Sequence, residues 1–178
     1  TQTHIHLMIN HLPIFGSIIG AFILMYGIWT KSGSTKSASY FVLIASALGA
    51  GVAYITGEAA KETVENIIGV AKSTIISHAD TAIYALICSI ILGLSSIVGL
   101  FLAARKQETS DKYANVVLII ALISFLVAAR TAFLGGEIRH SELNPESTTL
   151  KQVEQKAGEV KEKLEQKIEN KNDNLKVD

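Results

Sequence analysis

The sequence predicts an all-α membrane protein: an up-down bundle of four transmembrane helices followed by an amphipathic helix outside the membrane. Nearly all apolar residues lie in four runs, residues 5–29, 38–57, 81–104 and 113–134. Each run is about 20 residues or longer, which at 1.5 Å per residue spans the ~30 Å hydrocarbon core of a bilayer. The last 38 residues instead contain seven lysines and nine acidic residues.

The four runs lack the polar face that a soluble helix needs. The formal charges at or inside them are Asp80, beside the start of the third run, and Arg130, near the end of the fourth. The first run has no basic segment before it and no small-residue cleavage site, so we expect it to remain as the first helix. We therefore divide the chain into a lipid-embedded bundle, residues 1–142, and a polar helical tail, residues 143–178.

Positive charges in the short connections predict the orientation. Lys31 and Lys36 follow the first run, and Arg105, Lys106 and Lys112 follow the third. Because short segments rich in Lys and Arg stay in the cytoplasm, we expect both termini on the extracytoplasmic side.

Composition excludes several classes of function. The formal net charge is zero, so nothing predicts a nucleic-acid partner. The single cysteine, Cys88, has no partner in the chain for a disulfide or a thiolate metal cluster. No nucleophile and base constellation, phosphate loop or nucleotide motif is present, so no catalytic residue is predicted and enzymatic activity is left open.

Histidines are the most informative feature, because four antiparallel helices place all of them at one membrane face. They are His4, His6, His11, His78 and His140. Glu58, at the end of the second run, and Arg130 join this layer. An arginine in a membrane span costs roughly 3 kcal/mol or more unless it is paired, which marks it as a functional candidate. Its expected partner is either Glu58 or a carboxylate of a cofactor.

Stripes of small residues run below two of these histidines. In the third run the spacing is 4, 3, 4, 4 and 3, through His78, Ala82, Ala85, Ser89, Gly93 and Ser96. In the first run it is seven, through His6, Pro13, Gly20 and Gly27. Smooth walls below imidazole ligands suit a haem, which helical bundles hold by bis-histidine ligation. Small-residue stripes are also typical of simple helix packing in membranes, and His4 with His6 offers zinc or copper a short chelating pair.

Four motifs resemble a known group of sequences: HLMINHLPI at residues 6–14, TGEAAKETVE at 56–65, SHAD at 77–80 and GGEIRHSE at 135–142. Together they are similar to an uncharacterised bacterial family of small four-helix membrane proteins described as haem-binding. The resemblance covers roughly residues 3–142. It implies a b-type cytochrome-like subunit of the bacterial inner (plasma) membrane, with His6, His11, His78 and His140 as the motif histidines.

The expected cofactor is one or two haem b groups, bound non-covalently because the chain has no C-x-x-C-H motif. Two haems would use all four motif histidines, and one would leave two spare. Depth alone pairs His6 with His78. The positions further inside the membrane instead favour His11 with His78 and His6 with His140, and we expect this second pairing because Pro13 shortens or kinks the first helix.

The tail is expected to form a helix with Asn144 as its N-cap and Pro145 at its first position. An apolar stripe follows at Leu150, Val153, Ala157, Val160, Leu164 and Ile168. Either the helix is simply solvated, or it docks on a partner subunit or on another copy. Its balanced charges argue against a basic lipid-binding helix.

The leading hypothesis is a membrane electron-transfer subunit that exchanges electrons with a quinone or a periplasmic redox protein. The alternative is a cofactor-free structural or assembly subunit of a larger membrane complex, in which the tail is the working part. A metal or proton transporter is disfavoured, because the cytoplasmic halves of the four runs carry no ionisable residues.

Overall fold

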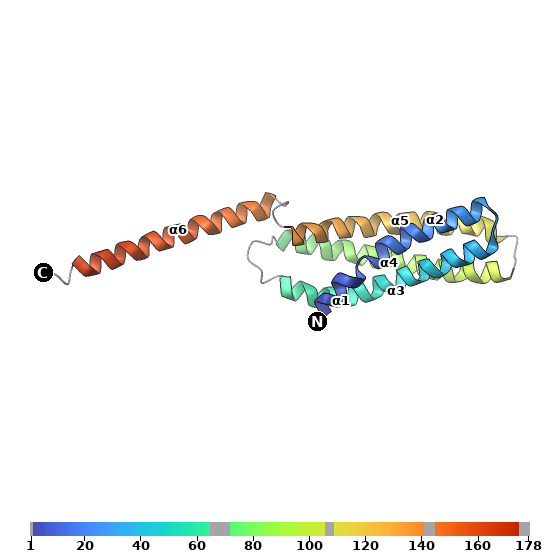
Figure 1. The fold of residues 1–178 in the computed structure, drawn as a ribbon, viewed down its shortest axis with the longest axis horizontal. Helices are drawn as coiled ribbons and strands as arrows, with labels where there is room; N and C mark the ends of the chain where they lie inside the picture. The colour runs from blue at the N-terminus through green and yellow to red at the C-terminus, as the bar shows by residue number, and fades with distance from the viewer. Residues whose placement is uncertain (1, 65–71, 106–108, 141–144, 175–178) are drawn as a thin grey trace.

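A computed structural model describes residues 2–64, 72–105, 109–140 and 145–174. Apart from short turns, this part of the chain is helical, in the order α1 (Gln2–Ile9), α2 (Leu12–Trp29), α3 (Gly33–Val64), α4 (Lys72–Ala104), α5 (Thr109–Arg139) and α6 (Pro145–Asn174). Helices α1 to α5 form an elongated bundle, and α6 extends beyond one end of it (Figure 1). The predicted all-α fold is confirmed.

Four stretches are long and apolar enough to cross a bilayer: Gln2–Trp29, Gly33–Lys61, Lys72–Ala104 and Ser110–Ile138. Each contains one of the four predicted apolar runs. Their outward faces carry large apolar side chains that are more than half exposed, such as Phe22, Leu48, Leu94 and Leu126, one from each stretch. Such extensive exposed apolar surface is unfavourable in water and favourable against lipid. The chain is a multi-pass membrane protein.

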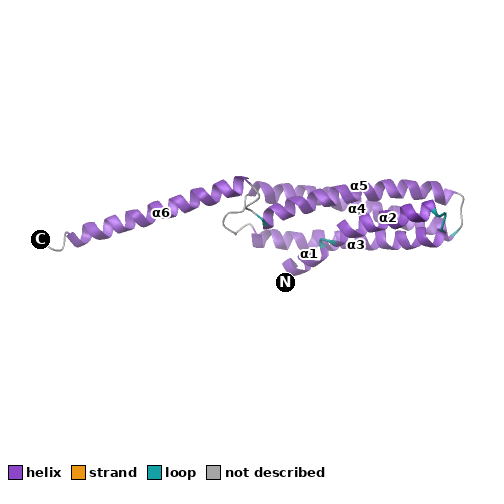
Figure 2. Ribbon diagram, turned by 45° about the horizontal axis from the view of Figure 1, so that its top comes forward, coloured by secondary structure: helices purple, strands orange, loops and turns teal. Residues whose placement is uncertain are grey.

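The first span is broken into two helices near Pro13. Helix α1 ends at Ile9, and α2 starts at Leu12 with Pro13 in its first turn (Figure 2). Proline has no N–H to donate to the carbonyl of residue 9, and its ring clashes with that carbonyl. The predicted shortening of the first helix at Pro13 is confirmed.

The four spans close into a ring. Helix α2 packs against α3 and α5, and α4 packs against the same two helices on the opposite side, while the short α1 packs against α3. The largest fully buried apolar side chains are Tyr40, Leu24, Leu43, Leu92 and Val117. All five lie toward the end of the bundle that is remote from α1, so the apolar core is concentrated there.

Glycines bring the helices into close contact in this half. A Cβ atom added to Gly93 of α4 would lie 2.8 Å from the Cβ of Ala47 on α3. One added to Gly99 would lie 2.6 Å from Cζ of Tyr40. Small residues at such contacts let membrane helices approach closely. In the half of α4 remote from the histidines, the stripe of small residues therefore serves helix packing.

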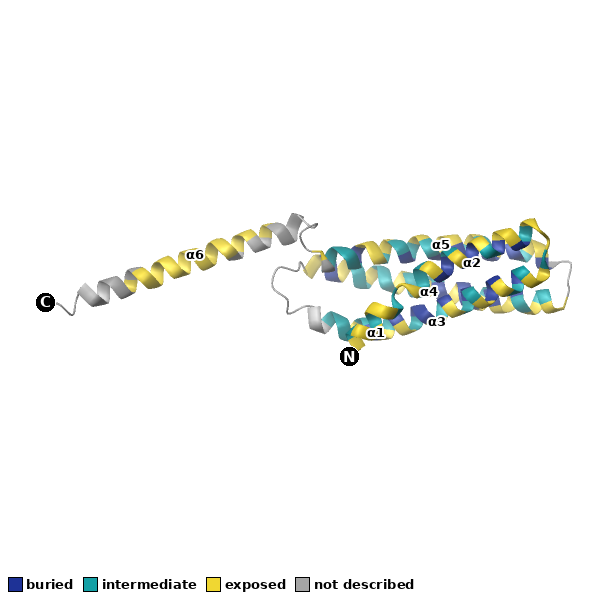
Figure 3. Cartoon of the chain, in the orientation of Figure 1, coloured by how far each residue is buried: buried dark blue, intermediate teal, exposed yellow. Residues whose placement is uncertain are grey.

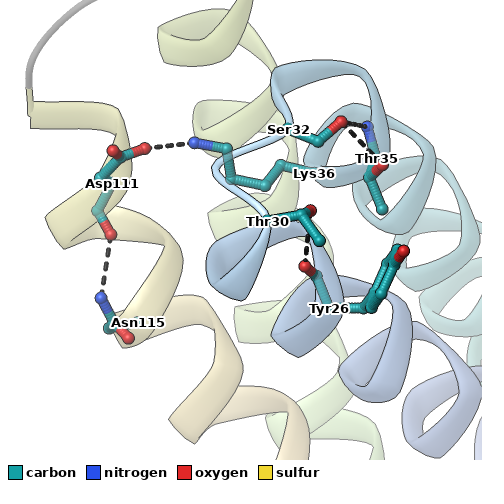
Figure 4. Close-up of polar contacts among 7 residues, drawn as sticks. All are labelled: Tyr26, Thr30, Ser32, Thr35, Lys36, Asp111 and Asn115. Carbon is teal, nitrogen blue, oxygen red and sulfur yellow. Dashed lines mark hydrogen bonds and ion pairs between the residues drawn. The ribbon is translucent and has the colours of Figure 1, made fainter.

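A tight turn joins α2 to α3 at the end remote from α1 (Figure 4). The N–H of Ser32 donates to the Gly27 carbonyl at 2.9 Å, and that of Lys31 donates to the Ile28 carbonyl at 3.1 Å. This is the Schellman pattern that ends a helix, and Lys31 occupies its left-handed position with φ of 53°. The Ser32 hydroxyl then accepts from the N–H of Thr35 at 3.3 Å and caps α3.

Lys36 lies inside α3 and forms an ion pair with Asp111 of α5 (Figure 4). The side chain of Lys36 is only 6% exposed, whereas that of Asp111 is 65% exposed. We expected Lys36 in a connecting loop. That expectation is wrong, because α3 starts at Gly33 and the long lysine stem is buried against the close approach at Gly27.

Helix α6 starts at Pro145, as predicted, whereas Asn144 and the expected domain boundary at residues 142 and 143 lie outside the described residues. The described side chains of its apolar stripe are largely exposed (Figure 3). They are Val153, Ala157, Val160, Leu164 and Ile168.

Candidate cofactor site at the histidine end

The bundle brings all five histidines to one end, as the antiparallel arrangement predicts. Helix α1, the start of α4 and the end of α5 lie together there, whereas the turn that joins α2 to α3, the end of α4 and the start of α5 lie at the other end (Figure 1). The histidines differ in how far they are buried. His6 and His78 are half-buried, whereas the other three are exposed.

His6 projects from α1 onto α3. Its Nδ1 atom lies 2.8 Å from the carbonyl oxygen of Ala53. Its ring lies over Gly57, where a Cβ atom would be only 3.2 Å from Cε1 and 3.3 Å from Nδ1. The imidazole is half-buried. A glycine at position 57 therefore gives the ring room to approach the backbone of α3.

His78 repeats this arrangement on the other pair of helices. Its Nδ1 atom lies 2.9 Å from the carbonyl oxygen of Thr131 on α5. A Cβ atom on Gly135 would be 3.1 Å from Cε1 of its ring. In both cases the glycine comes four residues after the residue whose carbonyl accepts the hydrogen bond. The packed helix pairs α1–α3 and α4–α5 thus present one imidazole each in the same local setting.

The imidazoles of His6 and His78 are close enough to interact electrostatically. Because a carbonyl oxygen can only accept a hydrogen bond, Nδ1 carries the hydrogen in both His6 and His78. The Nε2 atom of each neutral ring is then left with its lone pair. An imidazole oriented in this way, with its second nitrogen donating to a backbone carbonyl, is the usual arrangement of a metal-ligating histidine.

The remaining histidines are exposed. The ring of His11 stacks on Phe15 with centroids 6.3 Å apart, His140 follows the end of α5, and His4 lies near the start of α1. We expected His11 to pair with His78, and His6 with His140, and this pairing stays a prediction. Among the histidines, the one that interacts electrostatically with His78 is His6.

Arg130 and Glu58 lie on the outside of the bundle. Both side chains are exposed, and no ion pair joins them. The Cζ atom of Arg130 lies 5.8 Å from the centroid of the Phe133 ring. The expected ion pair between Arg130 and Glu58 is therefore not formed, because the two side chains point away from the interior and toward the surroundings of the bundle.

Asn10 is a candidate that the sequence analysis did not identify. It lies one turn after His6, since its N–H donates to the His6 carbonyl at 2.9 Å. Its Oδ1 atom is buried and has no hydrogen-bond partner among the described residues. A buried amide oxygen without a partner costs free energy, which makes Asn10 a candidate for contact with a bound group. Asparagine is common at helix breaks, so its sequence context gave no distinctive signal.

The inner face of α4 changes along its length. Ser89, Gly93 and Ser96 of the small-residue stripe are buried, whereas His78 and the two alanines that follow it on the same face are only half-buried. The same helix face is thus fully covered by neighbouring helices in one half of the bundle and incompletely covered beside His78.

Within the described ranges, no three His, Cys, Asp or Glu side chains lie close enough together to hold a metal ion. A tetrahedral zinc or copper site needs three or four such ligands, so this donor set does not support one. A haem iron differs, because the porphyrin supplies four nitrogens and the protein only the axial ligands. Comparisons of the chain with protein-family models, with curated proteins and with solved structures found no match.

Proposed function

We propose that the protein is a b-type cytochrome-like electron-transfer subunit of the membrane, in which one haem b is held non-covalently between His6 and His78. The observation that carries this proposal is the pair of similarly held imidazoles at one end of the bundle. Each has Nδ1 bonded to a backbone carbonyl, which leaves Nε2 to coordinate, and the two rings are close enough to interact electrostatically. The family resemblance of the histidine motifs points in the same direction.

The chemistry of the site fits a bis-histidine haem. The carbonyls of Ala53 and Thr131 fix the orientation of each ring and raise the basicity of its Nε2 atom. The half-buried alanines after His78 give a smooth wall, and the buried Oδ1 of Asn10 lies one turn from His6. A bound haem supplies reversible one-electron redox chemistry, and the surrounding apolar helices limit the access of water and tune its potential.

We further propose that the protein lies in the bacterial inner membrane with the histidine end and both termini on the extracytoplasmic side. The Lys and Arg residues near the opposite end of the bundle support this orientation. A haem near that surface is placed to exchange electrons with a quinone in the bilayer or with a periplasmic redox protein. His11 and His140 would then be spare, and the number of haems would be one.

An optical difference spectrum, reduced minus oxidised, tests the cofactor in protein purified from its native membrane. We expect the Soret and α bands of a six-coordinate haem b. His6→Ala and His78→Ala should each lose most of the haem, while His11→Ala, the matched control from the same helical span, should retain it. A purified protein without a Soret band would reject the haem, and loss of haem in His11→Ala with retention in His78→Ala would reject this ligand pair.

A cofactor-free assembly subunit is the second candidate, and the exposed apolar stripe of α6 favours it. Val160 and Leu164 lie one turn apart on this stripe, and both are more than half exposed. The two candidates separate on one measurement: replacing both residues with Asp should release partner subunits from the purified complex under the assembly hypothesis, whereas the haem spectrum should not change.

A further inference from the structure

The second polar region of the bundle lies at the end opposite the histidines. Its outermost part is the ion pair between Lys36 and Asp111, which joins α3 to α5. One turn deeper on α3 lies Tyr40, which interacts electrostatically with Asp111 and with Tyr113 of α5. The haem proposal uses none of these residues.

Two hydroxyl groups in this region are buried without a partner. Tyr40 and Ser96 are both 0% exposed. Neither the Oη atom of Tyr40 nor the Oγ atom of Ser96 has a hydrogen-bond partner among the described residues. The other buried serines on the neighbouring helices behave differently: Ser39 donates to the Gly20 carbonyl at 2.8 Å, and Ser124 to the Cys88 carbonyl at 3.1 Å. A hydroxyl left unpaired in an apolar interior is costly, so two in one region need an explanation.

The geometry around Gly99 relates the two hydroxyls to each other. A Cβ atom on Gly99 would lie 3.0 Å from Oη of Tyr40, so the phenol points at this position on α4. Ser96 lies three residues earlier on the same face of α4, where neighbouring Cβ positions are about 5–6 Å apart. The two oxygens do not bond directly, yet one turn of helix separates them. A single water molecule spans about this distance with one hydrogen bond to each oxygen.

We propose that the bundle binds an internal water molecule between Tyr40 and Ser96, so that water links α3 to α4 beside the ion pair that links α3 to α5. Each hydroxyl both donates and accepts, which meets the requirement of a buried water for two or more polar partners. The site is independent of the haem. At the end opposite the histidines, the bound water and the ion pair together connect three helices through polar contacts.

Radiolytic labelling in ¹⁸O-water tests the site directly in the full-length protein in detergent or nanodiscs. Hydroxyl radicals formed from a bound internal water label the side chains next to it, so Tyr40 should incorporate ¹⁸O although it is fully buried. Leu24, which is equally buried in the same core, is the control and should stay unlabelled. An unlabelled Tyr40, with exposed tyrosines such as Tyr84 labelled, would overturn the proposal.

A double-mutant cycle gives an independent energetic test. A bridging water predicts that Tyr40→Phe and Ser96→Ala each raise the equilibrium constant of unfolding about fivefold to tenfold, and that the double variant is affected less than the product of the two. If the hydroxyls are dry and unpaired, each substitution lowers that constant, and the proposal is wrong. Ser124→Ala is the matched control, and its effect should multiply with that of Tyr40→Phe because Ser124 bonds elsewhere.

Discussion

At the scale of single residues, the candidate site depends on what lies behind each imidazole. A helix backbone normally has no free carbonyl in its interior, but a carbonyl oxygen has two lone pairs and can accept a second hydrogen bond. The histidine ring can approach it only where the next turn carries no side chain. Gly57 and Gly135 provide this access, four residues after Ala53 and Thr131 respectively. Two glycines outside any turn are thereby explained as parts of the site.

Gly135→Ala should weaken haem binding, because the new methyl group would lie 3.1 Å from Cε1 of His78 and displace the ring by a few tenths of an ångström. We expect a several-fold lower haem affinity by titration, since supporting contacts of a ligating histidine contribute about tenfold or more. Gly136→Ala is the matched control, because the space beside that position is open. Equal haem affinity in both variants would mean that the position of the His78 ring does not govern binding.

The pair Arg130 and Glu58 leads to a different prediction. Both side chains are exposed and no ion pair joins them. The effects of Arg130→Leu and Glu58→Gln on the free energy of unfolding should therefore add, within about 0.5 kcal/mol. A clear excess in the double-mutant cycle would show that the two charges pair in the membrane. If Arg130→Leu also lowers the midpoint potential, the Arg130 cation acts on the haem electrostatically, because a nearby positive charge favours the reduced haem.

At the scale of secondary-structure elements, the turn between α2 and α3 has the hydrogen bonds of a Schellman motif, but a lysine occupies its left-handed position. Lys31 adopts φ of 53°, the left-handed position of the Schellman motif that glycine usually occupies. A side chain in this conformation costs roughly 1 kcal/mol. Its positive charge, however, lies at the end of the bundle where the other basic residues of the connections gather. The positive charge therefore explains a lysine at this position, whereas the backbone conformation alone would favour glycine.

Lys31→Gly should stabilise the protein by about 0.5–1 kcal/mol, because glycine removes the steric cost of the left-handed conformation. Reversible unfolding in mixed micelles measures the change. Thr30→Gly is the control and should destabilise, since Thr30 has a helical backbone with φ of −82° and gains nothing from the freedom of glycine. Stabilisation of both variants would show that the turn itself is flexible and that backbone strain is not the cause.

At the scale of the whole molecule, hydropathy predicted the four spans because lipid imposes a length and a polarity on every crossing segment. The break at Pro13 was equally predictable, since the cause is local. The surroundings of the individual histidines were not predictable, because they depend on which way the α1 face turns before the break. The buried ion pair of Lys36 was missed as well. From the sequence alone, a lysine near the end of a span is assigned to a loop or to the membrane–water interface. Whether its aliphatic stem is buried depends on how the helices pack.

The orientation in the membrane follows from the charge distribution and has a direct test. An even number of spans puts both termini on one side, and the positive charges near the α2–α3 turn predict that this turn is cytoplasmic. On a Cys88→Ser background, Ser34→Cys should resist a membrane-impermeant thiol reagent in intact cells, whereas Gln155→Cys should react. Both side chains are exposed, so each should react after the cells are lysed, which controls for intrinsic reactivity.

The reverse labelling pattern would invert the protein and place the histidine end in the cytoplasm. The haem proposal would survive that result, because the ligand geometry does not depend on orientation, but a periplasmic redox partner would be excluded. The basic residues would then violate the positive-inside rule at both short turns of one end. Such a violation requires another force to fix the topology, and α6 is the candidate, because a folded partner bound to its apolar stripe in the cytoplasm would prevent its translocation.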